Sequence, residues 1–367
     1  MPPVIKAPIT PPPANTMGPQ SELGRRARAV LDGARYGLSF AIGRYLASAP
    51  EPLDPAFTWG FLTGRPPAWQ RILIEGYPFR FQRRWILAKA FAGSHAAGIE
   101  EHYDVSNAFY RLFLDRELML YTCADFESDS DTLETAQRRK ADDLLALIRP
   151  AAGERILDLG CGWGGMMRHL HAATGEQGGL RGMTLSREQA RHVGETLGYD
   201  VVLDDFITAS FQPDSYDRIY GIGSIEHVRP AELQPLLQRL HRALAPDGRL
   251  VLQFFALNSD PLPTSQITGQ LFFPGSALSL YSEFLLAAGN AGFEIVHDSS
   301  RDYRPTLRAW FERLVENREE AISLAGLETY NRYLVFFAVS WAFFDQNQAT
   351  LHRLALEKTP ATRSINA

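Results

Sequence analysis

Residues 156–165 read "ILDLGCGWGG", and this stretch decides the fold of the chain. A short apolar strand ends at the first of four glycines, Gly160, and a predicted helix over 164–174 begins where the glycines end. Glycines permit a tight turn and a close approach of the backbone to a ligand, and a helix N-terminus favours anionic groups. We therefore predict a ligand-binding turn at the carboxyl end of a buried strand.

The spacing of the glycines distinguishes this turn from a dinucleotide-binding turn. It runs G-x-G-x-G through Gly160 and Gly162, whereas the dinucleotide fingerprint is G-x-G-x-x-G. Asp158 precedes the first glycine by two residues, and the pair Asp204–Asp205 follows a later predicted strand. Acidic groups in these places suit a ligand with a positive centre. The alternative is a plain turn from strand to helix, which would not need these acidic residues.

Strands and helices alternate from about residue 150, which predicts a parallel sheet covered by helices. The predicted strands cover residues 155–160, 180–185, 200–205, 216–223, 248–257, 293–298 and 350–356. The predicted helices cover residues 164–174, 186–197, 230–244, 277–292, 305–325 and 328–345.

Composition and cysteine content place the chain among ordinary globular proteins. It has 367 residues, 45% hydrophobic and 22% charged, and no apolar run reaches the roughly 18 residues of a membrane span. No basic and apolar leader of the secretory type is present, and only Cys123 and Cys161 are available for pairing. We therefore predict a cytoplasmic protein without disulfides. No group of His and Cys has the spacing of a zinc site, so no metal is expected.

The N-terminal part of the chain differs from the rest in composition and charge. Residues 1–20 are rich in proline and predict a disordered leader. Residues 21–95 predict a small domain, and residues 96–367 the catalytic one. Between 21 and 100 there are eleven Lys or Arg against six Asp or Glu, on a chain of net charge −5. This excess of positive charge favours docking on an anionic membrane. A basic surface that only faces solvent would have the same composition.

Seven stretches occur in an order that resembles the cyclopropane-fatty-acid synthase family, which includes the mycolic acid cyclopropane synthases. They are "HYDVSNAFYRLFLD" (102–115), "YTCADF" (121–126), "LDLGCGWGG" (157–165), "GMTLSREQ" (182–189), "SIEHV" (224–228), "FPGS" (273–276) and "DYRPTLRAWFERL" (302–314). The resemblance implies a class I S-adenosylmethionine-dependent methyltransferase. Its fold would be α/β: a doubly wound, Rossmann-like, seven-stranded and mostly parallel sheet, with extra helices over the active site.

The resemblance also implies a set of residues that hold S-adenosylmethionine. The set comprises small residues near the sulfonium, polar groups near the ribose and an aromatic ring against the adenine. In chain order these residues are Tyr121, Thr122, Asp158, Gly160, Gly162, Thr184, Leu185, Gln189, Asp205 and Phe206. Thr184, Leu185 and Gln189 would lie near the ribose, and Asp205 and Phe206 would flank the adenine.

The chemistry of the family explains a second set of residues. Methyl transfer to a cis double bond of an acyl chain leaves a carbocation, so the site must exclude water and supply a base for one proton. The family holds a bicarbonate ion as that base, with a Cys, a Glu, a His, a backbone amide and a Tyr. Cys123, Glu226 and Tyr303 match three of these positions.

The histidine position of the family is different in this chain. Where the family reads roughly L-L-H-x-I, this chain reads "LVLQFF", which places Gln253 and Phe255 there. A Gln amide donates the hydrogen bond that an imidazole N–H would give, so bicarbonate still has a donor, but the amide cannot take up a proton. A misdirected deprotonation would give a methylated olefin or methylene chain in place of a cyclopropane ring.

Three residues also have simpler interpretations. Cys123 could be a small buried apolar residue, and Tyr303 could do no more than cap a helix. Next to Glu226 stands His227. In an extended segment adjacent side chains point to opposite sides, so we expect His227 to brace the loop or pack under the sheet.

We consider three functions. The first is methylation or cyclopropanation of unsaturated acyl chains of phospholipid, by an enzyme docked peripherally on the inner face of the membrane. The second is N-methylation of a small amine, as in the benzylisoquinoline N-methyltransferases. The third is a non-catalytic acyl-binding or cofactor-sensing protein. No nucleic-acid partner is expected, and the sequence leaves a homodimer open.

Overall fold

The computed structural model describes residues 46–64, 106–175, 178–259, 272–273 and 277–359. Its centre is one seven-stranded sheet with the order β3-β2-β1-β4-β5-β7-β6. The strands are β1 Ile156–Leu159, β2 Leu180–Thr184, β3 Asp200–Leu203, β4 Tyr216–Ile222, β5 Leu244–Leu257, β6 Phe293–Arg301 and β7 Ala349–Lys358.

The first five strands pair in parallel, and β7 runs antiparallel between β5 and β6. The chain thus reverses its direction of sheet growth between β1 and β4, the place where doubly wound folds bind their ligands. This arrangement confirms the predicted α/β fold with a mostly parallel, seven-stranded sheet.

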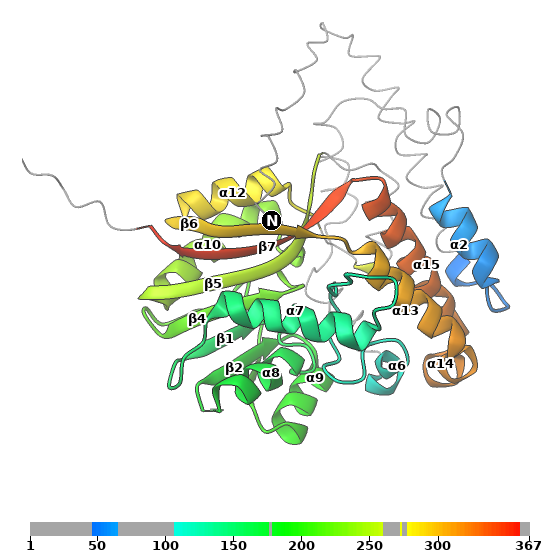
Figure 1. Cartoon of the computed structure of the whole chain (residues 1–367), viewed down its shortest axis with the longest axis horizontal. Coiled ribbons are helices and arrows are strands. Elements are labelled where there is room, and N and C mark those ends of the chain that lie inside the picture. Colours follow the sequence, from blue (N-terminus) through cyan, green and yellow to red (C-terminus); the bar gives the residue numbers. More distant parts are fainter. Residues whose placement is uncertain (1–45, 65–105, 176–177, 260–271, 274–276, 360–367) are drawn as a thin grey trace, which may run out of the picture.

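Helices cover both faces of the sheet (Figure 1). One face carries α7 (Leu133–Ile148), α8 (Gly165–Thr174) and the π-helical turn His192–Thr196 that continues α9 (Arg187–Arg191). Apolar side chains of α7 and α8, with Val193 of that turn, share a core with β1, β2 and β4. The other face carries α10 (Pro230–Ala243) and α12 (Tyr281–Asn290), which contact one another and form a second core with the sheet. Burial on both faces is why the strands read as continuous apolar runs.

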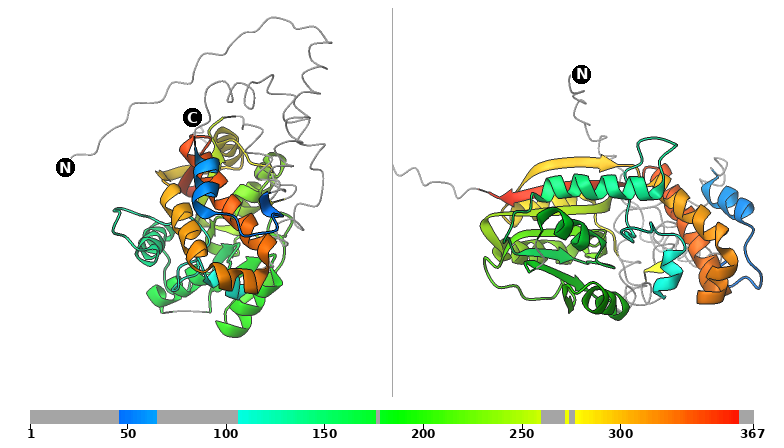
Figure 2. Two further views of the ribbon diagram at one scale, coloured as in Figure 1. Left: turned by 90° about the vertical axis from the view of Figure 1, so that its right-hand side faces the viewer. Right: turned by 60° about the horizontal axis from the view of Figure 1, so that its bottom comes forward.

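A further group of helices lies at one end of the sheet (Figures 1 and 2). Its members are α2 Pro55–Thr63, α6 Asn107–Arg111, α13 Arg304–Glu316, α14 Arg318–Ala325 and α15 Leu327–Asp345. They share an aromatic core of Phe, Tyr and Trp side chains. Asn107 accepts a hydrogen bond of 2.7 Å from Nε1 of Trp163 in the glycine turn. These helices therefore cap the carboxyl ends of the parallel strands.

Two predicted helices are divided in the structure. The stretch 186–197 forms α9 and then a π-helical turn, His192–Thr196. The stretch 305–325 divides at Asn317, whose side-chain amide donates to the carbonyl oxygens of Leu112 and Arg313. A side chain that bonds the backbone in this way competes with the helical ladder and permits the bend.

The described part of the predicted N-terminal domain is residues 46–64, and its helix α2 packs on the cap. The Trp59 ring lies 4.7 Å from that of Phe311 and 5.6 Å from that of Trp341, measured between centroids. The predicted leader, 1–20, and the rest of the 21–95 segment lie outside the described residues, so the domain division stays a prediction. No helix within the described ranges is long and apolar enough to span a bilayer.

Candidate active site

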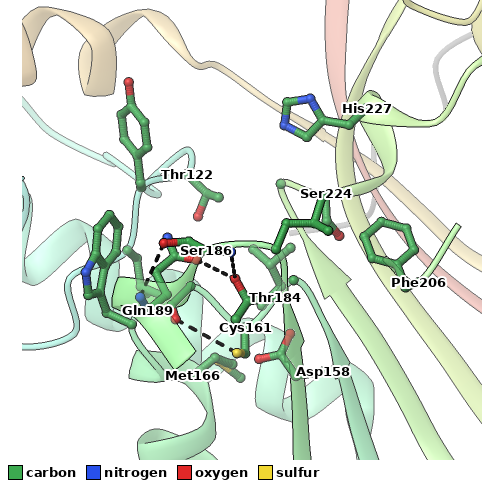
Figure 3. A pocket seen from close by; sticks show the side chains of 18 of the residues that line it. Thr122, Asp158, Cys161, Met166, Thr184, Ser186, Gln189, Phe206, Ser224 and His227 are labelled. Carbon is green, nitrogen blue, oxygen red and sulfur yellow. Dashed lines mark hydrogen bonds between the residues drawn. The ribbon is translucent and has the colours of Figure 1, made fainter. Parts of the chain in front are cut away.

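A pocket opens where the first four parallel strands end, between the sheet and the helical cap (Figure 3). Its wall is made by residues 119–122 and by the segments that follow β1, β2, β3 and β4. All ten residues predicted to hold the cofactor line it: Tyr121, Thr122, Asp158, Gly160, Gly162, Thr184, Leu185, Gln189, Asp205 and Phe206. We call it the cofactor pocket.

The glycine turn brings the backbone of β1 close to the segment after β4. Gly160 has a φ of 91°, and a Cβ at this residue would lie 2.8 Å from Cβ of Ser224. The amide nitrogens of Gly160 and Cys161 donate to the carbonyl oxygen of Met183 at 3.0 and 2.8 Å, which fixes the turn on β2. Only glycine combines this backbone angle with this approach.

Polar side chains after β2 are linked to each other on the pocket wall. The Thr184 hydroxyl donates to Oε1 of Gln189 at 2.7 Å and accepts from the amide of Ser186 at 3.2 Å. The Gln189 amide oxygen is thereby occupied, which leaves its NH₂ group to face a ligand. Such a donor matches the hydroxyls of a ribose.

The charge of the pocket wall suits a cationic ligand. Asp158 is buried, and burial raises the pKa of its carboxyl to about 7. A positive group bound beside it would lower that pKa and restore the carboxylate. Asp204 and Asp205 also line the pocket, whereas none of the described lining residues is Lys or Arg. This acidic wall fits the sulfonium of the expected cofactor.

An aromatic ring closes the end of the pocket beyond β3. Phe206 is 9% exposed, and the backbone at this corner is held because the Asp205 carboxylate accepts from the amide of Ile207 at 2.9 Å. Figure 3 shows Phe206 and Thr122 on opposite sides of the pocket, with Thr184 between them. The pocket thus runs from an aromatic end to a hydroxyl end, as an adenine joined to an amino-acid chain would require.

The four predicted catalytic residues lie outside this wall, on segments that meet beside it. We call Cys123, Glu226, Gln253 and Tyr303 the reaction cluster. Nε2 of Gln253 donates to the carbonyl oxygen of Cys123 at 3.4 Å, and Sγ of Cys123 lies 3.5 Å from the carbonyl oxygen of Asp302, next to Tyr303. Burial raises the pKa of the Cys123 thiol to about 12, so it is a neutral hydrogen-bonding group.

Gln253 is held in one orientation by a buried guanidinium. Its Oε1 accepts from Nε and Nη2 of Arg353 at 3.0 and 2.7 Å. Arg353 is 0% exposed and also forms a bidentate pair with Asp125, at 2.9 and 3.0 Å. With its oxygen bound to Arg353, the Gln253 amide presents its NH₂ group toward Cys123.

Glu226 stands in a short 3₁₀ turn, Ile225–His227, directly after β4. Gly223 opens this turn with a φ of 73°, and its amide donates to the carbonyl oxygen of Gln253 at 2.8 Å. The Glu226 carboxyl is buried, and among the described residues its Oε2 has no hydrogen-bond partner. Burial raises its pKa to about 8, so it is mostly protonated at neutral pH.

Tyr303 occupies the position before α13, and its side chain makes no capping hydrogen bond there. Its ring packs against Trp310 and Phe344, with centroids 5.9 and 5.1 Å apart. The first turn of α13 is tied to the segment of Cys123, because the amide of Ala124 donates to Oγ1 of Thr306 at 3.0 Å. The start of α13, which carries Tyr303, therefore lies beside the segment of Cys123.

The structure places His227 in the pocket wall rather than under the sheet, while its contact with Phe273 is compatible with the expected bracing of a loop. The two ring centroids lie 5.0 Å apart. The segment is a 3₁₀ turn rather than an extended strand, so its side chains do not alternate between two sides. Glu226 itself does not line the pocket, but its Oε1 lies 3.8 Å from the position of a Cβ built at Gly223, which does.

Sequence reasoning missed several residues of this region. Trp163 and Ser224 line the pocket. Both lie within recognised motifs, but only the glycines and acidic residues of those motifs were assigned a role. Lys140, on α7, and Arg353, on β7, are both 0% exposed. A buried cation is not recognisable from local sequence, because the same residue types usually face solvent.

Comparison with known proteins gives a family for most of the chain. Residues 92–354 match the family model of mycolic acid cyclopropane synthetase. A protein described as a probable fatty acid methyltransferase, from Pseudomonas putida, is 33% identical over 278 residues, which cover 72% of this chain and 69% of that protein.

Solved structures resemble the fold over the same region. Mycolic acid cyclopropane synthase CmaA1, complexed with SAH and CTAB, is 29% identical, with a TM-score of 0.64 over 72% of this chain and 99% of that one. Coclaurine N-methyltransferase, bound to N-methylheliamine and SAH, reaches a TM-score of 0.67 over 88% of this chain and 100% of that one. At 18% identity, the second likeness concerns the fold alone.

Proposed function

This chain belongs to the mycolic acid cyclopropane synthetase family and is an S-adenosylmethionine-dependent methyltransferase, and we propose that it methylates the double bond of an unsaturated acyl chain of a phospholipid. One observation carries the proposal. A buried, protonatable carboxyl, Glu226, whose Oε2 has no partner among the described residues, stands beside Gly223 at the edge of the cofactor pocket. A carbocation requires such a dry site and a group that handles one proton.

The residues of the cofactor pocket orient the cofactor in this proposal. When bound, S-adenosylmethionine supplies an electrophilic methyl group on a sulfonium. Asp158 and its acidic neighbours balance that charge, Gly160 lets the backbone come close, and Gln189 offers its amide to the ribose. Phe206 packs against the base.

The electrons and protons of the reaction balance as follows. The π pair of the acyl double bond forms the new carbon–carbon bond, while the carbon–sulfur bond breaks and leaves its pair on sulfur. The carbocation would then lose one proton to a bicarbonate ion held by the reaction cluster, which would give carbonic acid. Loss from the transferred methyl closes a cyclopropane ring, and loss from a neighbouring chain carbon gives a methylated alkene.

The reaction cluster would hold the bicarbonate through donors. The neutral Cys123 thiol, the Gln253 NH₂ group and the protonated Glu226 carboxyl can each donate to an anion. Glu226 alone of these can also exchange a proton with the carbonic acid. Gln253 can orient the base but cannot relay a proton, which is why a methylated alkene is a product to look for.

We also propose that the N-terminal part of the chain docks on an anionic membrane. Helix α2 exposes Phe57 and Phe61, 65% and 61%, on the side away from Trp59 and the cap. Replacing both by Ser should weaken binding to vesicles of anionic, unsaturated phospholipid by at least about a hundredfold, since burial of each ring in lipid contributes roughly 2 kcal/mol. Equal sedimentation of both proteins with vesicles would remove α2 from the docking surface.

One observation favours a second function, N-methylation of a small amine. His227 lines the cofactor pocket, where a neutral imidazole could take a proton from a substrate ammonium and so release the nucleophilic amine. The reaction cluster would then have no base to hold. Bound bicarbonate is not needed for methylation of an amine, and this is the chemical difference that separates the two functions.

Mass spectrometry of membrane fatty acids tests the proposal, after expression in a host that lacks such enzymes. We expect acyl chains that gain 14 daltons, with the remaining unsaturation separating a ring from a methylated alkene. The matched control is the Gly160→Ala variant, which should give far fewer such chains because its cofactor affinity is reduced. Unmodified acyl chains together with methylation of added amines would favour the second function instead.

A further inference from the structure

A buried lysine lies directly behind the hydroxyl end of the cofactor pocket. Lys140, on α7, is 0% exposed, and its Nζ donates to Oγ1 of Thr122 at 2.7 Å. Thr122 lines the pocket and Lys140 does not. The ammonium therefore acts on the pocket through the Thr122 hydroxyl.

The described part of the chain leaves this ammonium incompletely bonded. It has three N–H donors, and Thr122 accepts one of them. The carboxylate with the largest electrostatic effect on Lys140 is Asp115. It is itself occupied, because it accepts from the amides of Leu118, Met119 and Leu120 at 2.6, 3.2 and 2.8 Å. Burial lowers the pKa of Lys140 to about 7. A ligand with negative charge at the Thr122 hydroxyl would raise that pKa and stabilise the ammonium form.

The Thr122 hydroxyl is oriented by this contact. Since its oxygen accepts from Lys140, its own hydrogen is free to donate to an acceptor inside the pocket. Thr122 lies opposite the aromatic end marked by Phe206 (Figure 3). A cofactor with its adenine at Phe206 would place its amino-acid end at Thr122.

The rest of the wall offers no side-chain cation for that end. The charged residues among the described lining residues are Asp158, Asp204 and Asp205, and the only other titratable cation there is His227. An acidic wall suits the sulfonium but repels a carboxylate. We propose that Lys140, acting through Thr122, is the positioning residue for the carboxylate of the cofactor's amino-acid end.

A pair of ligands isolates this carboxylate. S-adenosylhomocysteine has it, and the decarboxylated analogue, 5′-deoxy-5′-(3-aminopropylthio)adenosine, lacks it but keeps the ammonium. For the full-length Lys140→Met variant, titration calorimetry should show a loss of at least about tenfold in affinity for S-adenosylhomocysteine, as expected when a charge-assisted bond is removed. Affinity for the analogue should stay within about twofold.

Gln137→Met is the matched control, because Gln137 is another fully buried polar residue of α7. Its Nε2 donates to the carbonyl oxygens of Leu120 and Thr122 at 3.0 and 2.9 Å, so it supports the same loop without a charge. Loosening the loop should lower the affinity for S-adenosylhomocysteine and for the decarboxylated analogue by similar factors. An equal loss of both ligands in Lys140→Met would therefore mean that Lys140 only shapes the loop, and would overturn the proposal.

Two other outcomes are decisive. Unchanged affinity for S-adenosylhomocysteine in Lys140→Met would assign the carboxylate to backbone amides of the glycine turn and overturn the proposal. If Lys140→Met does not fold, Thr122→Val must show the same selective loss, and an absence of selectivity there overturns it too. The inference rests on cofactor binding, not on the acyl substrate, so a failure to methylate lipid would leave it standing.

Discussion

Thr122 and Cys123 are neighbours in the chain, but they belong to two regions that use polar side chains in opposite ways. In the cofactor pocket, polar groups keep donors or acceptors for a ligand: the Gln189 NH₂ group and the buried Asp158 carboxyl are examples. Behind the reaction cluster, all five N–H donors of Arg353 have acceptors within the protein. The pocket keeps polar groups available for a ligand, whereas the Arg353 network fixes the side chains around it in one geometry.

The difference shows how each region responds to change. Polar groups of the pocket that lack partners lower the stability of the fold. A bound ligand supplies those partners and so offsets the loss of stability. Removing one partner of a buried ion pair costs about 3–5 kcal/mol, which keeps the amide of Gln253 in a single orientation. Glu226 is the exception in the reaction cluster, because its Oε2 has no partner among the described residues.

The Glu226→Gln substitution should therefore have the largest effect and should separate the two regions. Gln keeps a hydrogen-bond donor but cannot exchange a proton, so turnover should fall by at least about a hundredfold, the scale of acid–base catalysis. Affinity for S-adenosylhomocysteine, measured by calorimetry, should not change, since Glu226 does not line the cofactor pocket. Turnover near that of the native enzyme would remove Glu226 from the reaction.

The pH dependence of turnover provides the control. Burial raises the pKa of Glu226 to about 8, so the carboxyl is protonated below that pH and ionised above it. A carboxylate beside bicarbonate puts two negative charges in a buried site, and turnover should fall as pH rises through 8. The residual turnover of Glu226→Gln should lack this decline. A decline of equal size in the variant would assign it to another group.

The Gly160→Ala substitution should have the next largest effect and acts on the pocket alone. At a φ of 91° its Cβ would lie 2.8 Å from Cβ of Ser224, so the turn must move. We expect a loss of ten- to a hundredfold in affinity for S-adenosylhomocysteine, about 1.4–2.7 kcal/mol. Gly162→Ala, with a φ of 53° and no atom within 4 Å of its Cβ, is the matched control and should lose less. Equal losses would show that backbone angle, not the approach of Ser224, sets the effect.

The pocket could be predicted from the sequence more completely than the network behind the cluster, for a physical reason. The pocket is built from strand ends, and the motifs at those ends mark it locally. Arg353 lies on a predicted strand, but its partner Asp125 is 228 residues away, and no local pattern records such a pair. Helix α7 was missed although its buried face repeats every three or four residues. That face includes Gln137 and Lys140, so its pattern does not read as apolar.

The smallest effect is expected for Gln253→His, which tests whether the orientation of one side chain selects the product. An imidazole has one acceptor nitrogen, so it cannot accept both bonds that Arg353 gives to Oε1 of Gln253. It also adds a group that takes up a proton near Cys123. We expect the ratio of cyclopropane to methylated alkene to change several-fold, measured by mass spectrometry of the acyl chains, with overall turnover changing less.

Phe255→Ile separates proton handling from shape in that experiment. Phe255 contacts the ring of Phe344, with centroids 5.6 Å apart, so a smaller side chain changes the cap without adding a titratable group. If Phe255→Ile changes the product ratio as much as Gln253→His does, the shape of the cap selects the product. If neither changes products or kinetics, position 253 has no part in directing the proton. A change in Gln253→His alone would mean that product choice resides in the one orientation that Arg353 imposes on this side chain.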